Sequence, residues 1–430
     1  MPRAWAALRC KRPWSFTVTD SLHLQPPSLL GIVGPGLMGL GVAQRAAAKG
    51  ILVRMLARDA DAAQAARARW QALLQRQHER GRLPSEQLQT HLSAVQFTGD
   101  PQDLGPCSAV IESVPEDRAL KVRVLHQIEA VLAPDAWMAS NTSGLPIGGL
   151  AQPLRRPARF IGLHFFSPVE RMPLVEVVRG QATAQGTLQA ALALVQSLGQ
   201  QAVVVRDGPG FFTSRVFAAY LDEAVAMVGE GVAPALIEQA ALANGRSIGP
   251  LALLDEVSLQ LNLQQAQQAR ADGLPQRFCR PLAEPILAHL VALGRCGRRQ
   301  GGGFYDATSS AQRQLWPSLH SHFPLLAQQP ALTWVQQRLR CIEALQALQC
   351  LEEGVIARAE DADLASVLGL GFPKSRGGVL QDVARQGLPA FIAQCAQLAA
   401  VHGERFLVSP AWLARSREPK PLHPTDGSCS

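Results

Sequence analysis

Two polar blocks and one acid, each in or directly after an apolar run, have the residue types needed to oxidise an alcohol. The blocks are Ser140–Ser143 and His164–Pro168, and the acid is Glu176 within Leu174–Val178. Such a reaction needs a base that takes the hydroxyl proton while the carbon loses hydride, and histidine works near neutral pH. An acid in an apolar strand is costly to bury unpaired. The pattern predicts a pair of His164 with Glu176; a structural histidine beside a plain strand acid is the alternative.

A glycine-rich turn near the start of the chain predicts a dinucleotide site. The run Gly34-Pro35-Gly36-Leu37-Met38-Gly39 lies between a strand-like stretch, 29–33, and a helical stretch, 42–49. The first glycine permits a tight turn, the second lets a pyrophosphate approach the backbone, and the third lets the helix pack on the strand. An ordinary glycine-rich turn is the alternative. The predicted cofactor contacts in this loop are Gly34, Gly36, Leu37, Met38 and Gly39.

The end of the next strand, 51–56, bears on which dinucleotide is bound. A carboxylate usually stands there and holds the ribose hydroxyls, but this chain has Ala57 followed by Arg58, and Asp59 comes two residues late. Arg58 could neutralise a 2′-phosphate, which would favour NADP. Alternatively Arg58 is a solvated surface residue and Asp59 caps the next helix. The sequence leaves both readings open, with NAD as the expected cofactor and NADP as the alternative.

These residues need a scaffold, and the periodicity of the chain predicts its class. Strand-like runs alternate with helical stretches up to about residue 206, which indicates an α/β Rossmann-type, doubly wound parallel sheet. Beyond residue 206 the sequence has helical periodicity and contains a weak internal repeat. Its matching positions are Arg215 with Arg338, Glu230-Gly231-Val232 with Glu353-Gly354-Val355, and Gly249-Pro250 with Gly377-Gly378. Two all-α helical domains are therefore expected. The predicted parts are an N-terminal extension (1–28), the Rossmann domain (29–206), helical domains (207–310 and 330–415) and a disordered tail (416–430).

Composition narrows the classes of function. The 430 residues are 47% hydrophobic, which is enough for packed cores, and no apolar run is long enough to span a membrane. The formal charge of +7 suits a polyanionic substrate, but no dense basic run with interleaved aromatics predicts nucleic-acid binding. Eight scattered cysteines without a C-x-x-C pair indicate a reducing compartment and no metal site. Residues 1–19 are basic and resemble a transit peptide, although a short extension is preferred. We expect the cytoplasm, with an organelle matrix as the alternative.

Taken together, the motifs resemble the 3-hydroxyacyl-CoA dehydrogenase family from about Leu29 to Arg415. The resemblance rests on several blocks in the family's order. The second helical unit, with 371–378, is similar to the ending of the multifunctional β-oxidation enzymes, and the chain looks like their dehydrogenase part without the enoyl-CoA hydratase half. The blocks are the glycine loop, Ile111–Glu116 with Lys121, Ser140–Ser143, Phe160–Pro168, Leu174–Val178, Pro209–Phe211, Gly249-Pro250 with Leu254-Asp255, and Gly301–Tyr305.

The resemblance implies roles for the polar residues. His164 would be the general base, Glu176 its orienting partner, and Ser143 a hydrogen-bond donor to the substrate oxygen. Glu116 and Lys121 would lie near the nicotinamide ribose and the CoA entrance. Asn141 is assigned to the cofactor side. The implied substrate is a 3-hydroxyacyl-CoA of fatty-acid metabolism, and the chain would be a monomer or a homodimer.

Three positions depart from the family's pattern. Ala57 replaces the ribose-binding aspartate. Ser167 replaces a commoner asparagine, a change that some members share. Ser214 replaces an asparagine that reaches the active site, a loss of about 0.5–1.5 kcal/mol if nothing substitutes. Two other functions stay open: a dehydrogenase of a free hydroxy acid, and a non-catalytic binder of acyl-CoA or dinucleotide.

Overall fold

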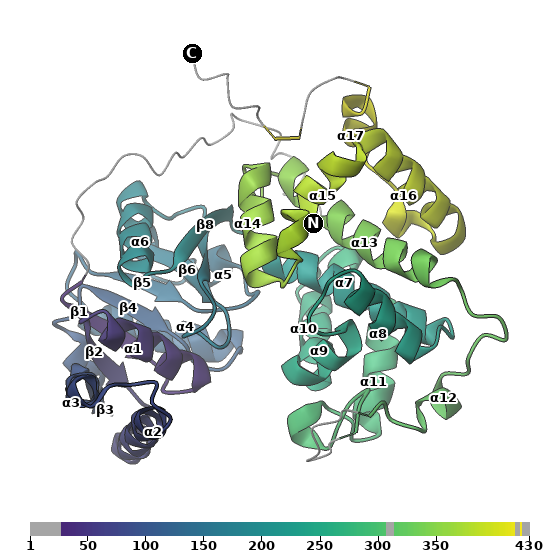
Figure 1. Cartoon of the computed structure of the whole chain (residues 1–430). Helices are drawn as coiled ribbons and strands as arrows, with labels where there is room; N and C mark the ends of the chain where they lie inside the picture. Colours follow the sequence, from purple (N-terminus) through teal and green to yellow (C-terminus); the bar gives the residue numbers. More distant parts are fainter. Residues whose placement is uncertain (1–26, 307–313, 418–421, 424–430) are drawn as a thin grey trace. The chain divides into compact units, whose positions relative to one another are not determined.

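The computed structural model describes residues 27–306, 314–417 and 422–423, so most of the predicted extension at 1–28 and most of the predicted tail at 416–430 lie outside the described residues. The chain divides into two compact units: residues 1–211 with 350–361, and residues 212–349 with 362–430. The first unit holds the sheet and the second is helical (Figure 1).

Eight strands of the first unit form one sheet in the order β3-β2-β1-β4-β5-β6-β7-β8. The order 3-2-1-4-5-6 is that of a Rossmann fold, as predicted. The strands β1 to β6 are parallel and confirm the predicted doubly wound sheet, whereas β7 runs antiparallel to β6 and β8 is parallel to β7, an edge that the sequence did not predict. The strands are β1 Leu29–Val33, β2 Leu52–Leu56, β3 Val95–Thr98, β4 Ala109–Glu112, β5 Trp137–Ser140, β6 Phe160–Phe165, β7 Leu174–Arg179 and β8 Gln201–Arg206.

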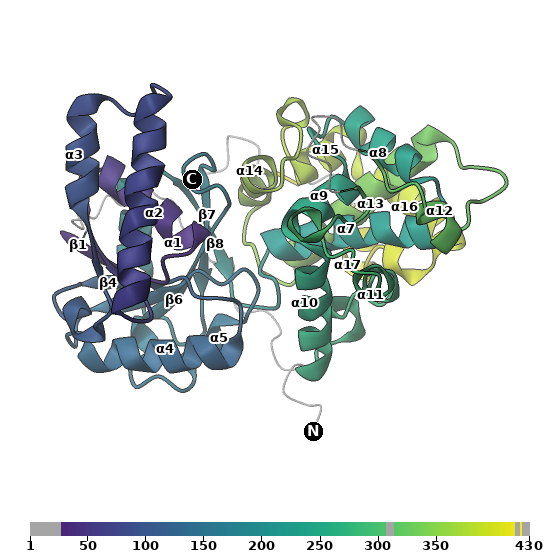
Figure 2. The ribbon, with the colours of Figure 1, turned by 90° about the horizontal axis from the view of Figure 1, so that it is seen from below.

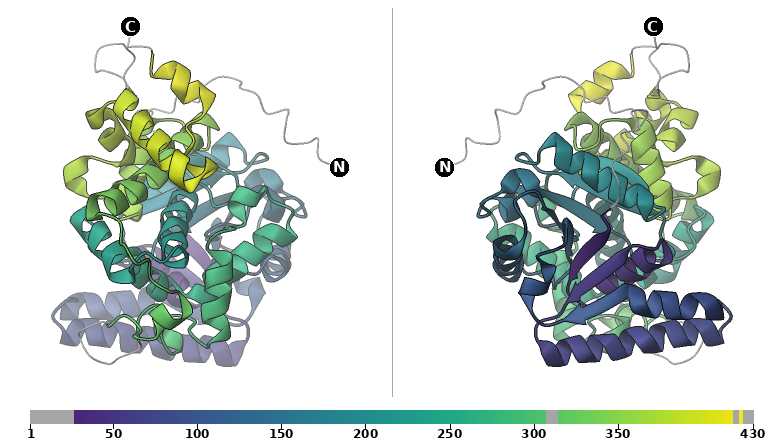
Figure 3. Two further views of the ribbon diagram at one scale, coloured as in Figure 1. Left: turned by 90° about the vertical axis from the view of Figure 1, so that its right-hand side faces the viewer. Right: turned by 90° about the vertical axis from the view of Figure 1, so that its left-hand side faces the viewer.

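Helices cover both faces of the sheet because side chains of successive strand residues point to opposite faces. One face, with Ile32 and Met55, packs against α1, α2, α3 and α6. The other is covered by α4 and α5, and Figure 2 shows these two helices across the sheet from α1 and α2. In Figures 2 and 3, α2 and α3 run side by side. The helices are α1 Leu37–Ala48, α2 Ala60–Glu79, α3 Ser85–Ala94, α4 Arg118–Val131, α5 Ile147–Ala151 and α6 Gln185–Ser197.

The second unit carries the internal repeat. The helices α7 and α13 both lead into Glu-Gly-Val, where Gly231 and Gly354 take positive φ angles of 85° and 68°. One apolar core holds residues from α7 to α11 together with Val335 and Leu339 of α13. Among the described residues, no helix combines the length and apolarity that crossing a bilayer requires. The helices are α7 Thr213–Gly229, α8 Pro234–Ala243, α9 Pro250–Val257, α10 Leu259–Ala271, α11 Glu284–Ala292, α12 Leu319–His322, α13 Leu332–Glu352, α14 Ala359–Gly369, α15 Val379–Gln386, α16 Leu388–His402 and α17 Pro410–Arg415.

Candidate active site

The antiparallel pairing of β6 with β7 brings the predicted base and acid together. His164 lies directly opposite Glu176 in the register, and cross-strand neighbours project from the same face. The His164 Nδ1 atom lies 3.0 Å from Glu176 Oε2. The histidine is 8% exposed and the glutamate is fully buried. Because an ionised carboxylate only accepts hydrogen bonds, it places the proton of a neutral imidazole on Nδ1 and leaves Nε2 with a lone pair.

Aromatic rings flank the imidazole. The ring of Phe166 lies 4.5 Å from that of His164, centroid to centroid, and the ring of Phe211 lies at 6.3 Å. Both phenylalanines belong to the same compact unit as the histidine. These rings restrict the rotation of the imidazole and lower the polarity around it, so the His164–Glu176 hydrogen bond is shielded from water.

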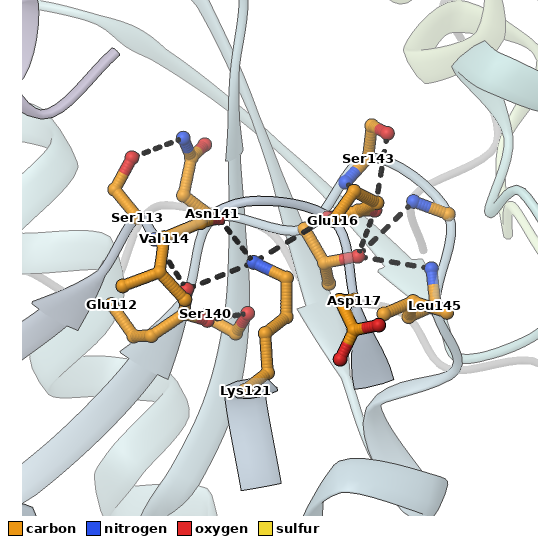
Figure 4. Close-up of polar contacts among 12 residues, drawn as sticks. Glu112, Ser113, Val114, Glu116, Asp117, Lys121, Ser140, Asn141, Ser143 and Leu145 are labelled. Atoms are coloured by element: carbon orange, nitrogen blue, oxygen red, sulfur yellow. Dashed lines mark hydrogen bonds and ion pairs between the residues drawn. The ribbon is translucent and has the colours of Figure 1, made fainter. Parts of the chain in front are cut away.

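A second polar cluster lies at the ends of β4 and β5 and is centred on Lys121 of α4 (Figure 4). Its ammonium nitrogen lies 2.8 Å from Glu112 Oε1, 3.1 Å from the Val114 carbonyl oxygen and 3.4 Å from Glu116 Oε2. Lysine has three N–H donors, so these partners use its full capacity. Lys121 is 1% exposed, and we conclude that in this structure it positions Glu116. A contact of its own with a ligand stays a prediction.

Glu116 connects this cluster to the Ser140–Ser143 block. Its Oε1 atom accepts from the Thr142 hydroxyl at 2.5 Å, the Ser143 backbone N–H at 3.0 Å and the Ser143 hydroxyl at 3.2 Å. The structure therefore brings Glu116, Lys121 and Ser143 together, and their roles toward substrate and cofactor stay predictions. To donate to a substrate oxygen, the Ser143 hydroxyl must turn away from Glu116.

Sequence reasoning missed Glu112, which is fully buried at the end of β4. Besides Lys121, its carboxylate accepts from the Ser140 hydroxyl at 2.5 Å and the Val114 backbone N–H at 2.7 Å. The available signal was a charged residue at the end of the apolar run Ala109–Ile111, nine positions before a lysine on an amphipathic helix. Such a residue needs a buried partner, and Lys121 is that partner.

Asn141, which the sequence assigned to the cofactor side, links three strand ends. Its Oδ1 atom accepts from the Phe165 backbone N–H at 2.9 Å, and its Nδ2 atom donates to the Ser113 hydroxyl at 3.2 Å. These bonds tie the residues after β4 and β5 to the end of β6. The amide thereby holds the strand ends in line, and its contact with a cofactor stays a prediction.

The glycine loop has the geometry of a dinucleotide cradle. Gly34 takes a φ of 101°, and a Cβ there would lie 2.6 Å from the Ser113 carbonyl oxygen. A Cβ on Gly39 would overlap the Gly34 carbonyl oxygen, so α1 can pack on β1 only with glycine there. A Cβ on Gly36 would meet nothing within 4 Å. That open space, beside a helix start with no side-chain cap, fits a pyrophosphate. Leu37 and Met38 form the first turn of α1, and Leu37 is 62% exposed.

At the end of β2 the structure shows how the exposed charges are arranged. Ala57 is buried. Asp59 caps α2 by accepting from the Ala62 backbone N–H at 2.8 Å, and its other oxygen lies 2.9 Å from Arg58 Nε. The capping bond, and after it the bond to Arg58, lower the pKa of Asp59. The same ion pair raises the pKa of Arg58, whose side chain is 88% exposed.

Ser214 lies in the first turn of α7 in the helical unit. Its contact with the active site stays a prediction. No group of three or more His, Cys, Asp or Glu side chains that could hold a metal ion occurs among the described residues.

A Rossmann sheet with a glycine loop and a buried His–Glu pair defines an NAD-dependent oxidoreductase of the α/β class. The family model for the NAD-binding domain of 3-hydroxyacyl-CoA dehydrogenase matches residues 29–208, and the model for its C-terminal domain matches residues 210–307. The chain therefore belongs to the 3-hydroxyacyl-CoA dehydrogenase family.

Individual relatives agree. The fatty acid oxidation complex subunit alpha of Vibrio cholerae is 32% identical over 398 residues, which are 91% of this chain and 55% of that protein. The chain thus spans about half the length of the curated relatives it matches. The crystal structure of (S)-3-hydroxybutyryl-CoA dehydrogenase from Ralstonia eutropha is 34% identical with a TM-score of 0.61, covering 64% of this chain and 98% of that one. The 3-hydroxybutyryl-CoA dehydrogenase of Escherichia coli K12 is 25% identical with a TM-score of 0.79, covering 91% and 99%.

Proposed function

We propose that this chain oxidises the 3-hydroxyl group of an (S)-3-hydroxyacyl-CoA to a 3-oxo group, with NAD as the hydride acceptor, in fatty-acid metabolism. The observation that carries the proposal is the buried pair of His164 and Glu176, 3.0 Å apart. Membership of the 3-hydroxyacyl-CoA dehydrogenase family and the similarity to two 3-hydroxybutyryl-CoA dehydrogenases support the choice of substrate. The open space at Gly36 supports binding of the dinucleotide.

Each residue of the proposed site has its own role in the reaction. The lone pair on His164 Nε2 takes the proton of the substrate hydroxyl, and Glu176 stabilises the imidazolium that forms. The Ser143 hydroxyl, which donates to Glu116 in this structure, turns from that carboxylate and donates to the substrate oxygen. The chemistry that bound NAD supplies is acceptance of the hydride from C3 of the substrate. Ser214 is the fourth residue of the proposed catalytic set.

The reaction is tested by absorbance at the nicotinamide band with (S)-3-hydroxybutyryl-CoA, a longer 3-hydroxyacyl-CoA and free 3-hydroxybutyrate. Reduction with the CoA esters and not with the free acid is expected. His164→Ala should lower kcat by at least about 100-fold while NAD binding is kept. Glu176→Gln should also lower kcat, because its amide can hold the wrong tautomer. The matched control is His126→Ala, which removes an exposed histidine of the same unit. A folded protein that reduces NAD with none of these substrates would be a binder and not a dehydrogenase.

Two further properties belong to the proposal. The six described cysteines form no disulfide with one another, which supports a reducing compartment, the cytoplasm first and an organelle matrix as the alternative. The second helical repeat packs into the same core as the first, which supports a monomer over a homodimer. Sedimentation equilibrium at micromolar concentration distinguishes the two states, and fractionation of cells that produce the protein tests the compartment.

A further inference from the structure

We propose that the adenosine end of the dinucleotide site accepts a 2′-phosphate, so that the chain binds NADP in addition to NAD, with Arg58 as the residue that recognises the phosphate. The inference rests on dinucleotide binding alone and not on the acyl substrate. The residue directly after β2 is not a carboxylate. Ala57 stands where a carboxylate would hold the two ribose hydroxyls, and its side chain is buried and apolar. A carboxylate there also repels a 2′-phosphate, and this chain has no such repulsion at residue 57.

The next carboxylate along the chain is already engaged. One oxygen of Asp59 caps α2 through the Ala62 backbone N–H, and the other accepts from Arg58. Turning toward a ribose would cost Asp59 both contacts. The aspartate therefore acts on the arginine, because it fixes the guanidinium through Nε at 2.9 Å. Among the described residues, the two terminal amino groups of Arg58 donate to no other group, and they form the fork that binds phosphate in pairs of hydrogen bonds.

A second guanidinium lies at the same edge of the sheet. Arg69, from the middle of α2, donates from Nη2 to the Pro35 carbonyl oxygen of the glycine loop at 3.3 Å. The loop itself is tied to the end of β2, because the Gly34 backbone N–H donates to the Leu56 carbonyl oxygen at 3.0 Å. Thus Arg58 follows β2, and Arg69 is bonded to the glycine loop, which is itself tied to the end of β2. A ribose bound between the loop and β2 would carry its 2′ position to this pair of cations.

The two arginines discriminate between a ribose with a free 2′-hydroxyl and one with a 2′-phosphate. An unphosphorylated ribose offers two hydroxyls and gains little from a guanidinium, whereas a 2′-phosphate gains charge-assisted hydrogen bonds. The structure thus favours recognition of the extra phosphate by the exposed arginines.

Isothermal titration calorimetry with adenosine 2′,5′-bisphosphate and adenosine 5′-monophosphate tests the proposal, because these probes differ only in the 2′-phosphate. The wild-type chain should bind the bisphosphate at least about tenfold more tightly. Arg58→Ala should reduce that preference to within about twofold and leave binding of the monophosphate unchanged. Arg69→Ala should reduce the preference partly. Ala57→Asp should reverse it, because the new carboxylate accepts from the ribose and repels the phosphate.

The matched control is Arg67→Ala. Arg67 is an exposed arginine of α2 two residues from Arg69, so it points to a different side of the helix. Its loss should change neither affinity. Equal affinity of the wild-type chain for both probes, binding of neither, or a preference that survives Arg58→Ala would overturn the proposal. The titrations contain no acyl substrate. Absence of dehydrogenase activity would therefore contradict the proposed reaction without affecting the measured preference for the 2′-phosphate.

Discussion

Lys121 is the residue on which the polar cluster at the ends of β4 and β5 depends. Its charge lies between two carboxylates, and one of them, Glu112, is completely buried. Lys121→Met would leave Glu112 as a buried charge held only by neutral donors. We expect a loss of about 3–5 kcal/mol in the free energy of unfolding, which urea denaturation followed by circular dichroism would measure.

The double variant Glu112→Gln with Lys121→Met provides the control for that prediction. It removes both charges, so it should be more stable than Lys121→Met alone. A double variant as unstable as the sum of its single changes would show that the ion pair is not what holds this site. In the double variant Glu116 loses its buried cation, and the affinity for NAD should still fall.

Sequence reasoning reached these residues unevenly, for physical reasons. His164 and Glu176 were paired correctly because each stands within a strongly apolar, strand-like run. Glu112 was missed because it ends a strand, where an acid is as readily solvent-exposed as buried. The antiparallel turn at β7 could have been foreseen, since residues 166–173 are fewer than the dozen or so that a parallel crossover needs. The strand Val95–Thr98 went unrecognised because only Val95 is buried and its neighbours include Gln96 and Thr98.

At the scale of elements, two glycines of the glycine loop have different roles: Gly39 allows helix packing, and Gly36 leaves room for the cofactor. Gly39 is needed for the fold, since a Cβ there would overlap the backbone oxygen of Gly34 and force α1 off β1. Gly36 has open space around its Cα. Gly36→Ala should therefore cost at most about 1 kcal/mol of stability, the scale of a lost helix cap, yet weaken NAD binding strongly.

Gly39→Ala should instead lower the stability of the Rossmann unit by about 1–3 kcal/mol, as overpacking does. Thermal unfolding and fluorescence titration with NAD, run on both variants, check the pair of predictions. Equal loss of stability in the two variants would mean that Gly36 is as constrained as Gly39 and is not an opening for the pyrophosphate.

At the scale of the whole molecule, buried charges join the two helical repeats. Arg338 on α13 is 2% exposed and holds Glu223 of α7 and Glu230 directly after that helix, the latter through bonds of 2.6 and 2.7 Å. Arg405 adds a bond of 2.7 Å to Glu223. Arg338→Met should cost about 3–5 kcal/mol in unfolding of the helical unit, because Glu223 stays buried with only part of its charge offset.

The matched control is Arg340→Met, two residues along the same helix. Arg340 is 31% exposed and pairs with Asp382 inside the second repeat, so its loss should cost about 1 kcal/mol or less. Differential scanning calorimetry should show one helical transition that moves down in temperature for Arg338→Met. Two separated helical transitions would contradict a shared core for the two repeats.

The same charge cluster predicts how the helical unit responds to acid. The Trp334 indole N–H donates to His402 Nε2 at 3.3 Å, so this nitrogen must be unprotonated in the folded state. Burial, and after it the positive charge of Arg338, lower the pKa of His402, although Glu230 and Glu223 oppose the shift. The unfolded chain, with a histidine pKa of about 6.5, then binds the proton more readily than the folded chain.

It follows that the contribution of His402 to stability is fully present above about pH 6.5 and is lost as the pH falls toward the lower folded value. We expect His402→Gln, whose amide oxygen can still accept from Trp334, to lose less stability than the wild-type chain between pH 7.5 and 5.5. Urea unfolding at both pH values measures the difference, with His126→Gln, at an exposed position, as the control. If the variant and the wild-type chain lose equal stability over this range, the acid response comes from the carboxylates of the cluster, among them Glu230, whose pKa is lowered by Arg338.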